Sequence, residues 1–215
     1  RVDRRQRQMC IRDRLLLKNA FRILEKNGFH KMTSFKNWIN ASRPRTLPLS
    51  ISGILIGSSY AYFLGSFDLL IFLMIVATAI SFQILSNFAN DYGDAIKGSD
   101  QYRQTNDRMV QTGKISKEEM KKGIFIMSIS GFFSGLLLIF FSFPIEDTYK
   151  ILLFLVIGVL AIVASIKYTV GRAAYGYHGL GDLFVFLFFG IVGVFGSFFL
   201  FTQEINILAV PGSLY

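Results

Sequence analysis

The chain alternates between long apolar stretches and short polar segments. Five stretches of about 20 residues contain at most one charged residue each: 47–67, 69–89, 123–143, 151–170 and 183–202. A helix rises about 1.5 Å per residue, so about 20 apolar residues cross the hydrocarbon core of a bilayer. The pattern therefore predicts an all-α, polytopic transmembrane helix bundle with five complete spans, and a sixth that begins near Ile205.

The segment between the first two stretches predicts a tight hairpin. Asp68 is its one charged residue, and Gly65 and Ser66 are residues that turns favour. We expect the two spans to pack as antiparallel neighbours. In the first span, Gly53 and Gly57 have the small-xxx-small spacing that lets membrane helices approach closely.

The distribution of basic residues predicts the orientation in the membrane. Residues 90–122 contain seven Lys or Arg, whereas residues 142–150 contain one Lys and two acids. Short loops rich in Lys and Arg stay in the cytoplasm. The longer loop is therefore expected to be cytoplasmic, and the basic segment near residue 170 reaches the same side after two more crossings. We predict a multi-pass protein of the cytoplasmic membrane.

The composition is typical of a membrane protein, since 52% of the residues are hydrophobic and the mean hydropathy is +0.45. Residues 1–31 contain ten Lys or Arg and three acids, and so carry +7 of the net charge of +9. We predict a basic N-terminal extension over 1–31, with Met32 as the natural start, and one transmembrane domain over 32–215. A basic arm held by anionic lipid is the alternative for 1–31. The charge gives no support for a nucleic-acid partner.

Acids and amides gather where the second stretch ends. Asn87, Asn90, Asp91 and Asp94 are three or four residues apart and therefore share one face of a helix. Their hard oxygen ligands suit Mg²⁺ and could converge on one cation. The alternative is a helix end whose polar side chains only cap and solvate the backbone.

The loop that follows places cations next to these acids. Asp100 lies among Arg103, Arg108 and Lys114, so groups that hold a metal adjoin groups that hold phosphate. A diphosphate leaving group needs both. Positive-inside topology alone is the alternative explanation for the lysines of this loop.

A second polar cluster precedes the last stretch and includes Arg172, Tyr175, Tyr177 and Asp182. Asp182 opens a span, so we expect it either to face the protein interior or a watery cavity, or to act as an ordinary helix cap. The tyrosines could form an interfacial belt, or could line a pocket whose ring faces stabilise a carbocation. His178 lacks metal-ligand spacing to His30, so the sequence does not support zinc.

Four segments in this order resemble the UbiA superfamily of intramembrane aromatic prenyltransferases: 38–53, the Asn-Asp-x-x-Asp core at 90–94, Gln-Thr-Gly at 111–113, and 179–190. The resemblance covers the chain from Met32 to its last residue. It implies a bundle of about nine spans and a Mg²⁺-dependent transfer of a polyprenyl group from polyprenyl diphosphate to 1,4-dihydroxy-2-naphthoate. Loss of CO₂ accompanies the transfer, which belongs to menaquinone synthesis.

The resemblance also implies roles for particular residues. Mg²⁺ and the diphosphate would be held by Asn90, Asp91 and Asp94, and by Asp100 near the place of a later acid where this chain has Gly98. The diphosphate would be gripped by Arg43, Arg108, Lys114 and Arg172. The aromatic acceptor and prenyl side would include Asn87, Tyr175, Tyr177 and Asp182, and we predict Asp91, Asp94 and Asp182 as catalytic.

The superfamily has a second Asp-rich motif that this chain does not contain. We therefore expect a C-terminally truncated piece of a longer enzyme, inactive alone. Three alternatives stay open at this point: another aromatic or haem-type prenyltransferase, a cation-coupled membrane transporter fragment, and a lipid head-group transferase. The last uses membrane-border acids with Mg²⁺, but its more widely repeated Asp and Gly pattern is not found.

Overall fold

The computed structural model describes residues 34–98, 108–171 and 174–204, and within these ranges the chain contains helices and connections but no strand. The predicted all-α fold is confirmed. The proposed extension over 1–31 lies outside the described residues, so its origin stays a prediction.

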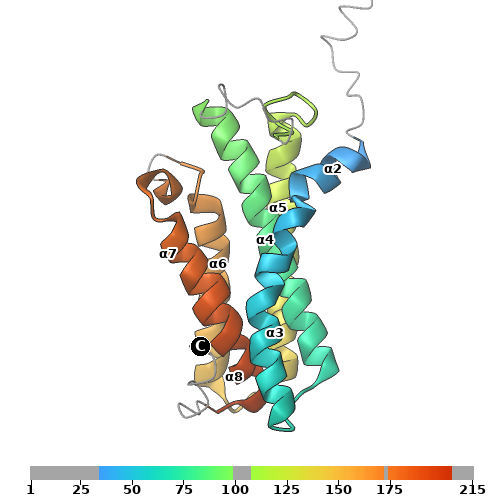
Figure 1. Ribbon diagram of the computed structural model, residues 1–215, viewed down its shortest axis with the longest axis vertical. Coiled ribbons are helices and arrows are strands. Elements are labelled where there is room, and N and C mark those ends of the chain that lie inside the picture. Colours follow the sequence, from blue (N-terminus) through green and yellow to red (C-terminus); the bar gives the residue numbers. More distant parts are fainter. Residues whose placement is uncertain (1–33, 99–107, 172–173, 205–215) are drawn as a thin grey trace, which may run out of the picture. The chain divides into compact units, whose positions relative to one another are not determined.

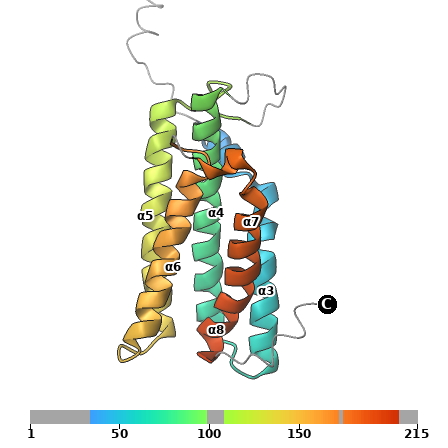
Figure 2. The ribbon, with the colours of Figure 1, turned by 90° about the vertical axis from the view of Figure 1, so that its left-hand side faces the viewer.

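The helices follow one another in simple order. They are α2 (Phe35–Ser42), η1 (Pro44–Thr46), α3 (Leu47–Phe63), α4 (Leu69–Lys97), α5 (Lys117–Ser142), α6 (Thr148–Lys167) and η2 (Tyr175–His178). The last segment runs without interruption through α7 (Gly181–Val185), the π-helical η3 (Phe186–Gly196) and α8 (Ser197–Thr202). Figures 1 and 2 show the long helices running alongside one another as a bundle.

Four helical segments are long and apolar enough to cross a membrane: α4, α5, α6 and the 22-residue segment from α7 to α8. They confirm four of the five predicted spans. The fifth, α3, has 17 residues, which is the lower limit of the usual range for a spanning helix. It is shorter than its apolar stretch because the chain turns at Gly65, whose φ of 77° is in the left-handed region.

The predicted hairpin between α3 and α4 is confirmed. Asp68 precedes the first residue of α4, and its carboxylate accepts a hydrogen bond from the Ile71 N–H at 2.9 Å. This cap satisfies one of the free N–H groups at the helix start. The next helix start is similar, since Ser116 and Glu119 form a capping box that begins α5 six residues before the predicted apolar stretch.

The glycines of α3 permit close packing, as predicted. A Cβ atom at Gly53 would overlap the carbonyl oxygen of Phe189 in η3, and one at Gly57 would overlap the hydroxyl of Ser197 in α8. The absence of side chains at these positions therefore brings the last helical segment against α3.

The described residues of both polar clusters lie at one end of the bundle, which we call the polar end. There α3, α5 and α7 begin and α4 and α6 end, at the top of Figures 1 and 2. The long Asp-bearing helix α4 continues through the whole acidic segment and ends at Gly98 with a φ of 71°. The predicted placement of the two clusters on one side is thus found, while its assignment to the cytoplasm stays a prediction.

Candidate active site

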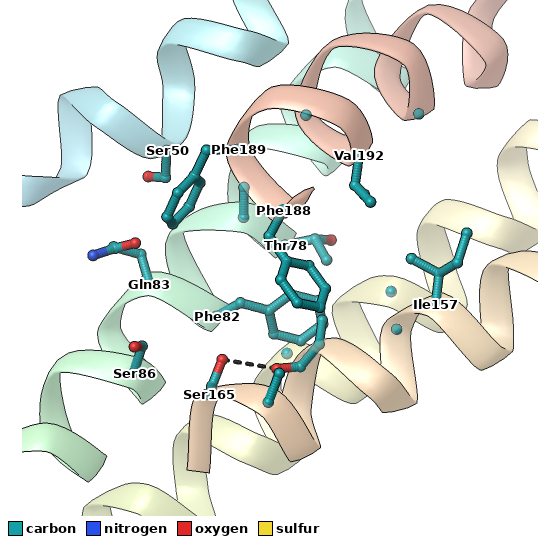
Figure 3. A pocket seen from close by; sticks show the side chains of 18 of the residues that line it. Ser50, Thr78, Phe82, Gln83, Ser86, Ile157, Ser165, Phe188, Phe189 and Val192 are labelled. Atoms are coloured by element: carbon teal, nitrogen blue, oxygen red, sulfur yellow. Dashed lines mark hydrogen bonds between the residues drawn. The ribbon is translucent and has the colours of Figure 1, made fainter. Parts of the chain in front are cut away.

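A cavity of about 360 Å³ lies between α3, α4, α5, α6 and the segment from α7 to α8. Most of its lining is apolar and aromatic. In Figure 3 the polar side chains of Ser50, Gln83 and Ser86 lie on one side, and Ile157 and Val192 lie on the other. Such a space suits an apolar ligand that carries a few polar groups.

The cavity approaches the polar end through two amides of α4. Asn87 and Asn90 both line it. On the same helix, Asn87 precedes Asp91 by one turn and Asn90 is its immediate neighbour. Asp91 and Asp94 do not line the cavity but are buried next to it on α4. The arrangement places an apolar space directly beside charged groups.

Asp91 is held inside the protein. Its side chain is 1% exposed, and its Oδ2 atom accepts a hydrogen bond from the backbone N–H of Met109 at 2.9 Å. Its other oxygen, Oδ1, is buried and has no hydrogen-bond partner among the described residues. A buried carboxylate oxygen without a partner is costly, and a bound cation would remove that cost.

Asp94 lies one turn further along α4. Its Oδ2 atom is 2.7 Å from an Arg108 guanidinium nitrogen, and the Tyr177 hydroxyl donates to its Oδ1 at 2.5 Å. The ammonium of Lys97 lies 3.7 Å from the centre of the Tyr177 ring. These contacts join η2 and the segment that precedes α5 to the acids of α4.

Arg43 faces the same acids from the connection between α2 and η1. Its backbone is left-handed, with a φ of 49°, and its Nη2 atom is buried without a hydrogen-bond partner among the described residues. Burial and the neighbouring Arg108 lower the pKa of Arg43, while the carboxylates of Asp91 and Asp94 partly offset this effect. A half-buried cation whose buried Nη2 has no partner among the described residues is suited to an anionic ligand.

Thr169 docks onto the acidic segment from the residues after α6. Its hydroxyl is 2.9 Å from the Ala89 carbonyl oxygen and 3.2 Å from the Asn90 side-chain oxygen. Gly93 permits this approach, because a Cβ atom there would lie 2.7 Å from Thr169 atoms. Gly93, one of the two x positions of the Asn-Asp-x-x-Asp core, thus serves helix packing, whereas the Asn and Asp residues supply the chemical groups.

Tyr175 lines the cavity near the polar end. Its hydroxyl donates to the Ala164 carbonyl oxygen at 2.7 Å, and its ring stacks on Phe184 with 4.0 Å between centroids. Burial raises the pKa of Tyr175 to about 12, so the phenol stays protonated and neutral. Tyr177 contacts Asp94 instead, so the two predicted tyrosines lie in different surroundings.

Several predicted site residues are not brought together. The side chains of Lys114 and Asp182 are exposed, so Asp182 is not buried in the protein interior as one of our expectations required. Asp100 and Arg172 lie outside the described residues. Within the described ranges no three His, Cys, Asp or Glu side chains form a group able to hold a metal. Asn87 is engaged by Ser42 and Thr46.

Sequence reasoning overlooked three polar residues that organise the site. They are Thr46, Thr169 and Gln83, of which the last two are buried and Gln83 lies in the middle of an apolar span. Gln83 has a signal that could have been used, because it precedes Asn87 by four residues and therefore lies on the same helix face.

These features define a membrane-type helix bundle with a cluster of charged side chains beside an apolar cavity. Residues 50–215 match the UbiA prenyltransferase family, and the chain belongs to that family.

Proteins named 1,4-dihydroxy-2-naphthoate octaprenyltransferase are among its relatives. The one from Haemophilus influenzae is 43% identical over 80% of this chain and 56% of its own length. Those from Escherichia coli and Mycobacterium tuberculosis are 43% and 32% identical, over 76% and 82% of this chain and 53% and 57% of their own lengths. The chain thus spans about half the length of these relatives. No solved structure matches it.

Proposed function

We propose that this chain forms part of an enzyme that transfers a polyprenyl group from polyprenyl diphosphate to 1,4-dihydroxy-2-naphthoate, with loss of CO₂, in menaquinone synthesis. The proposal places the enzyme in the cytoplasmic membrane with its polar end toward the cytoplasm. The observation that carries it is the pair of buried, unpartnered atoms beside an apolar cavity: Oδ1 of Asp91 and Nη2 of Arg43. The names of the relatives support the choice of substrates.

In this proposal two carboxylates and an amide of α4 would hold a magnesium ion, and the arginines beside them would hold a diphosphate. The free Asp91 oxygen is a hard, anionic ligand, and Asp94 and Asn90 supply further oxygens from the same helix. Asp100, outside the described residues, would be a further ligand. Mg²⁺ bound there would neutralise the negative charge on the diphosphate oxygens.

The protein's own groups account for the remaining steps. Arg43 and Arg108 would bind the diphosphate, which leaves with the electron pair of the broken carbon–oxygen bond. Arg108 is now paired with Asp94 at 2.7 Å, so binding would require it to share that contact. The apolar cavity would hold the prenyl chain and exclude water from the allylic cation.

The aromatic acceptor then forms the new bond. The ring faces of Tyr175 and Phe184, stacked at the cavity wall, can stabilise the allylic cation while the naphthoate carbon that bears the carboxylate attacks it. The ring regains aromaticity when its carboxylate leaves as CO₂. In this account the chain contributes electrostatics and orientation rather than a covalent nucleophile.

A chimera tests the proposal. This chain would be continued by the C-terminal part of the Haemophilus influenzae relative that it does not match, and membranes containing the chimera would receive polyprenyl diphosphate, 1,4-dihydroxy-2-naphthoate and Mg²⁺. We expect prenylated product from the chimera and none from this chain alone.

Other outcomes would change the assignment. Turnover with a different phenol would keep the prenyl transfer and replace the acceptor. A folded chimera that is silent with every acceptor would favour the transporter alternative. Against that alternative, the charged side chains of the described spans lie in their end turns, whereas cation transport favours acids at depth.

A further inference from the structure

We infer that Gln83 recognises a hydroxyl group of the aromatic acceptor, and that it does so together with Asn87 as a pair of oriented amide oxygens on α4. The inference rests on the proposed function, because it names how that function's acceptor would be held. Gln83 is 8% exposed and lines the cavity, one helical turn from Asn87.

The orientation of the two amides follows from a single threonine. The hydroxyl of Thr46 donates its one proton to the Arg43 carbonyl oxygen at 2.9 Å. Its lone pairs must therefore accept the other two contacts, which come from Gln83 at 3.2 Å and Asn87 at 3.0 Å. Only amide nitrogens can donate, so both side chains present nitrogen to Thr46.

A second contact fixes Asn87 independently. Its amide nitrogen lies 2.7 Å from the backbone carbonyl oxygen of Ser42, which can only accept. Both amide hydrogens of Asn87 are thereby used, and the group left to face other partners is its oxygen. The assignment of nitrogen and oxygen in these side chains is thus determined by their neighbours rather than by their shape.

The oxygen of Gln83 is the unusual atom. It is buried and has no hydrogen-bond partner among the described residues. Figure 3 shows the amide with its nitrogen on the outer side and its oxygen on the side of Phe189. An acceptor kept dry in this way gains most from a ligand that brings a donor.

The amide oxygens of Gln83 and Asn87 indicate the chemistry of the ligand. Two acceptor oxygens on successive turns, with about 6 Å of rise between their residues, suit a ring with hydroxyl groups at opposite edges. A dihydric phenol has that form, and each hydroxyl can donate one hydrogen bond. Gln83 and Asn87 would therefore select a dihydroxylated ring over the same ring without hydroxyls.

Equilibrium binding to this chain, purified in detergent under reducing conditions without metal or prenyl diphosphate, tests the inference. The probes are 1,4-dihydroxy-2-naphthoate and 2-naphthoate, which differ by the two hydroxyls. We expect the dihydroxy compound to bind at least tenfold more tightly, which is about 1.4 kcal/mol. Gln83→Met should lower its affinity severalfold and leave that of 2-naphthoate unchanged. Ser81→Ala, on the same helix but outside the cavity lining, should alter neither affinity.

Thr46 supplies a second pair of variants if Gln83→Met fails to fold. Thr46→Val should reduce the preference for the dihydroxy compound and Thr46→Ser should retain it. Equal affinities for the two compounds, no binding of either, or a Gln83→Met variant that weakens both equally would overturn the inference. Because binding needs no turnover, an inactive chimera with an intact preference would reject the proposed reaction and not this site.

Discussion

Gly93 is the position where the packing of the candidate site can be tested most sharply. In a Gly93→Ala variant the new Cβ atom would lie 2.7 Å from the Cβ, carbonyl oxygen and hydroxyl oxygen of Thr169. None of these atoms is the far end of a flexible side chain, so relief requires the segment after α6 to move away from α4. That movement would break the hydrogen bond of 2.9 Å between the Thr169 hydroxyl and the Ala89 carbonyl.

Two opposing effects determine how much Gly93→Ala changes the free energy of unfolding. Overpacking of a well-packed site costs about 1–3 kcal/mol, and the rigid neighbours of Gly93 favour the upper part of that range. Replacing a helical glycine by alanine regains about 0.5–1 kcal/mol through backbone entropy. We therefore expect Gly93→Ala to lower the free energy of unfolding by about 1–2 kcal/mol.

Gly158 in α6 is the matched control, because a Cβ atom there would meet no atom within 4 Å. Gly158→Ala should show only the entropy effect and raise the free energy of unfolding by about 0.5–1 kcal/mol. Reversible unfolding in mixed detergent micelles measures both variants. Equal stability of Gly93→Ala and the parent chain, or destabilisation of both variants alike, would refute the close approach of Thr169.

Three further predictions concern the polar end and the topology. In the chimera, Asp94→Asn should abolish Mg²⁺-dependent product formation. It should also lower the free energy of unfolding, since it removes the charge that Arg108 pairs with at 2.7 Å; undiminished turnover in the folded variant would remove the metal role. Arg43→Gln should raise the KM for polyprenyl diphosphate at least tenfold, whereas Lys36→Gln, on the exposed surface of α2, should not; equal effects would mean a non-specific loss of charge. With Cys10 replaced by Ser, a cysteine at the exposed Glu146 should react with an impermeant reagent from the non-cytoplasmic side only; cytoplasmic labelling would reverse the topology.

The helices could be predicted from the sequence because they depend on a local property. A run such as 69–89 must be helical if it lies in a bilayer, where every backbone group needs a partner within the segment. The ends of the helices were less predictable. The start of α5 at Lys117 depends on the capping box of Ser116 and Glu119, which lies outside the apolar stretch.

The candidate site was predictable only as a set of residue types. The acids of α4 have a recognisable spacing, but their partners come from elsewhere in the chain: Met109 is 18 residues from Asp91, and Thr169 is 80 residues from Ala89. Such pairings depend on how helices pack, which no local pattern encodes. Gln83 was overlooked for a different reason, because an uncharged amide does not interrupt an apolar run when charges alone are counted.

We propose that the acids and arginines at the polar end bind a magnesium diphosphate next to the apolar cavity. Calorimetric titration of the chimera with an uncleavable polyprenyl thiolodiphosphate, with Mg²⁺ or with EDTA, tests it directly. Asp91→Asn is the informative variant, because it removes the charge but keeps an oxygen for the Met109 N–H. We predict binding that requires Mg²⁺ and weakens at least tenfold in Asp91→Asn. Equal affinity with Mg²⁺ and with EDTA, or equal affinity of the Asp91→Asn variant and the parent chimera, would refute this proposal.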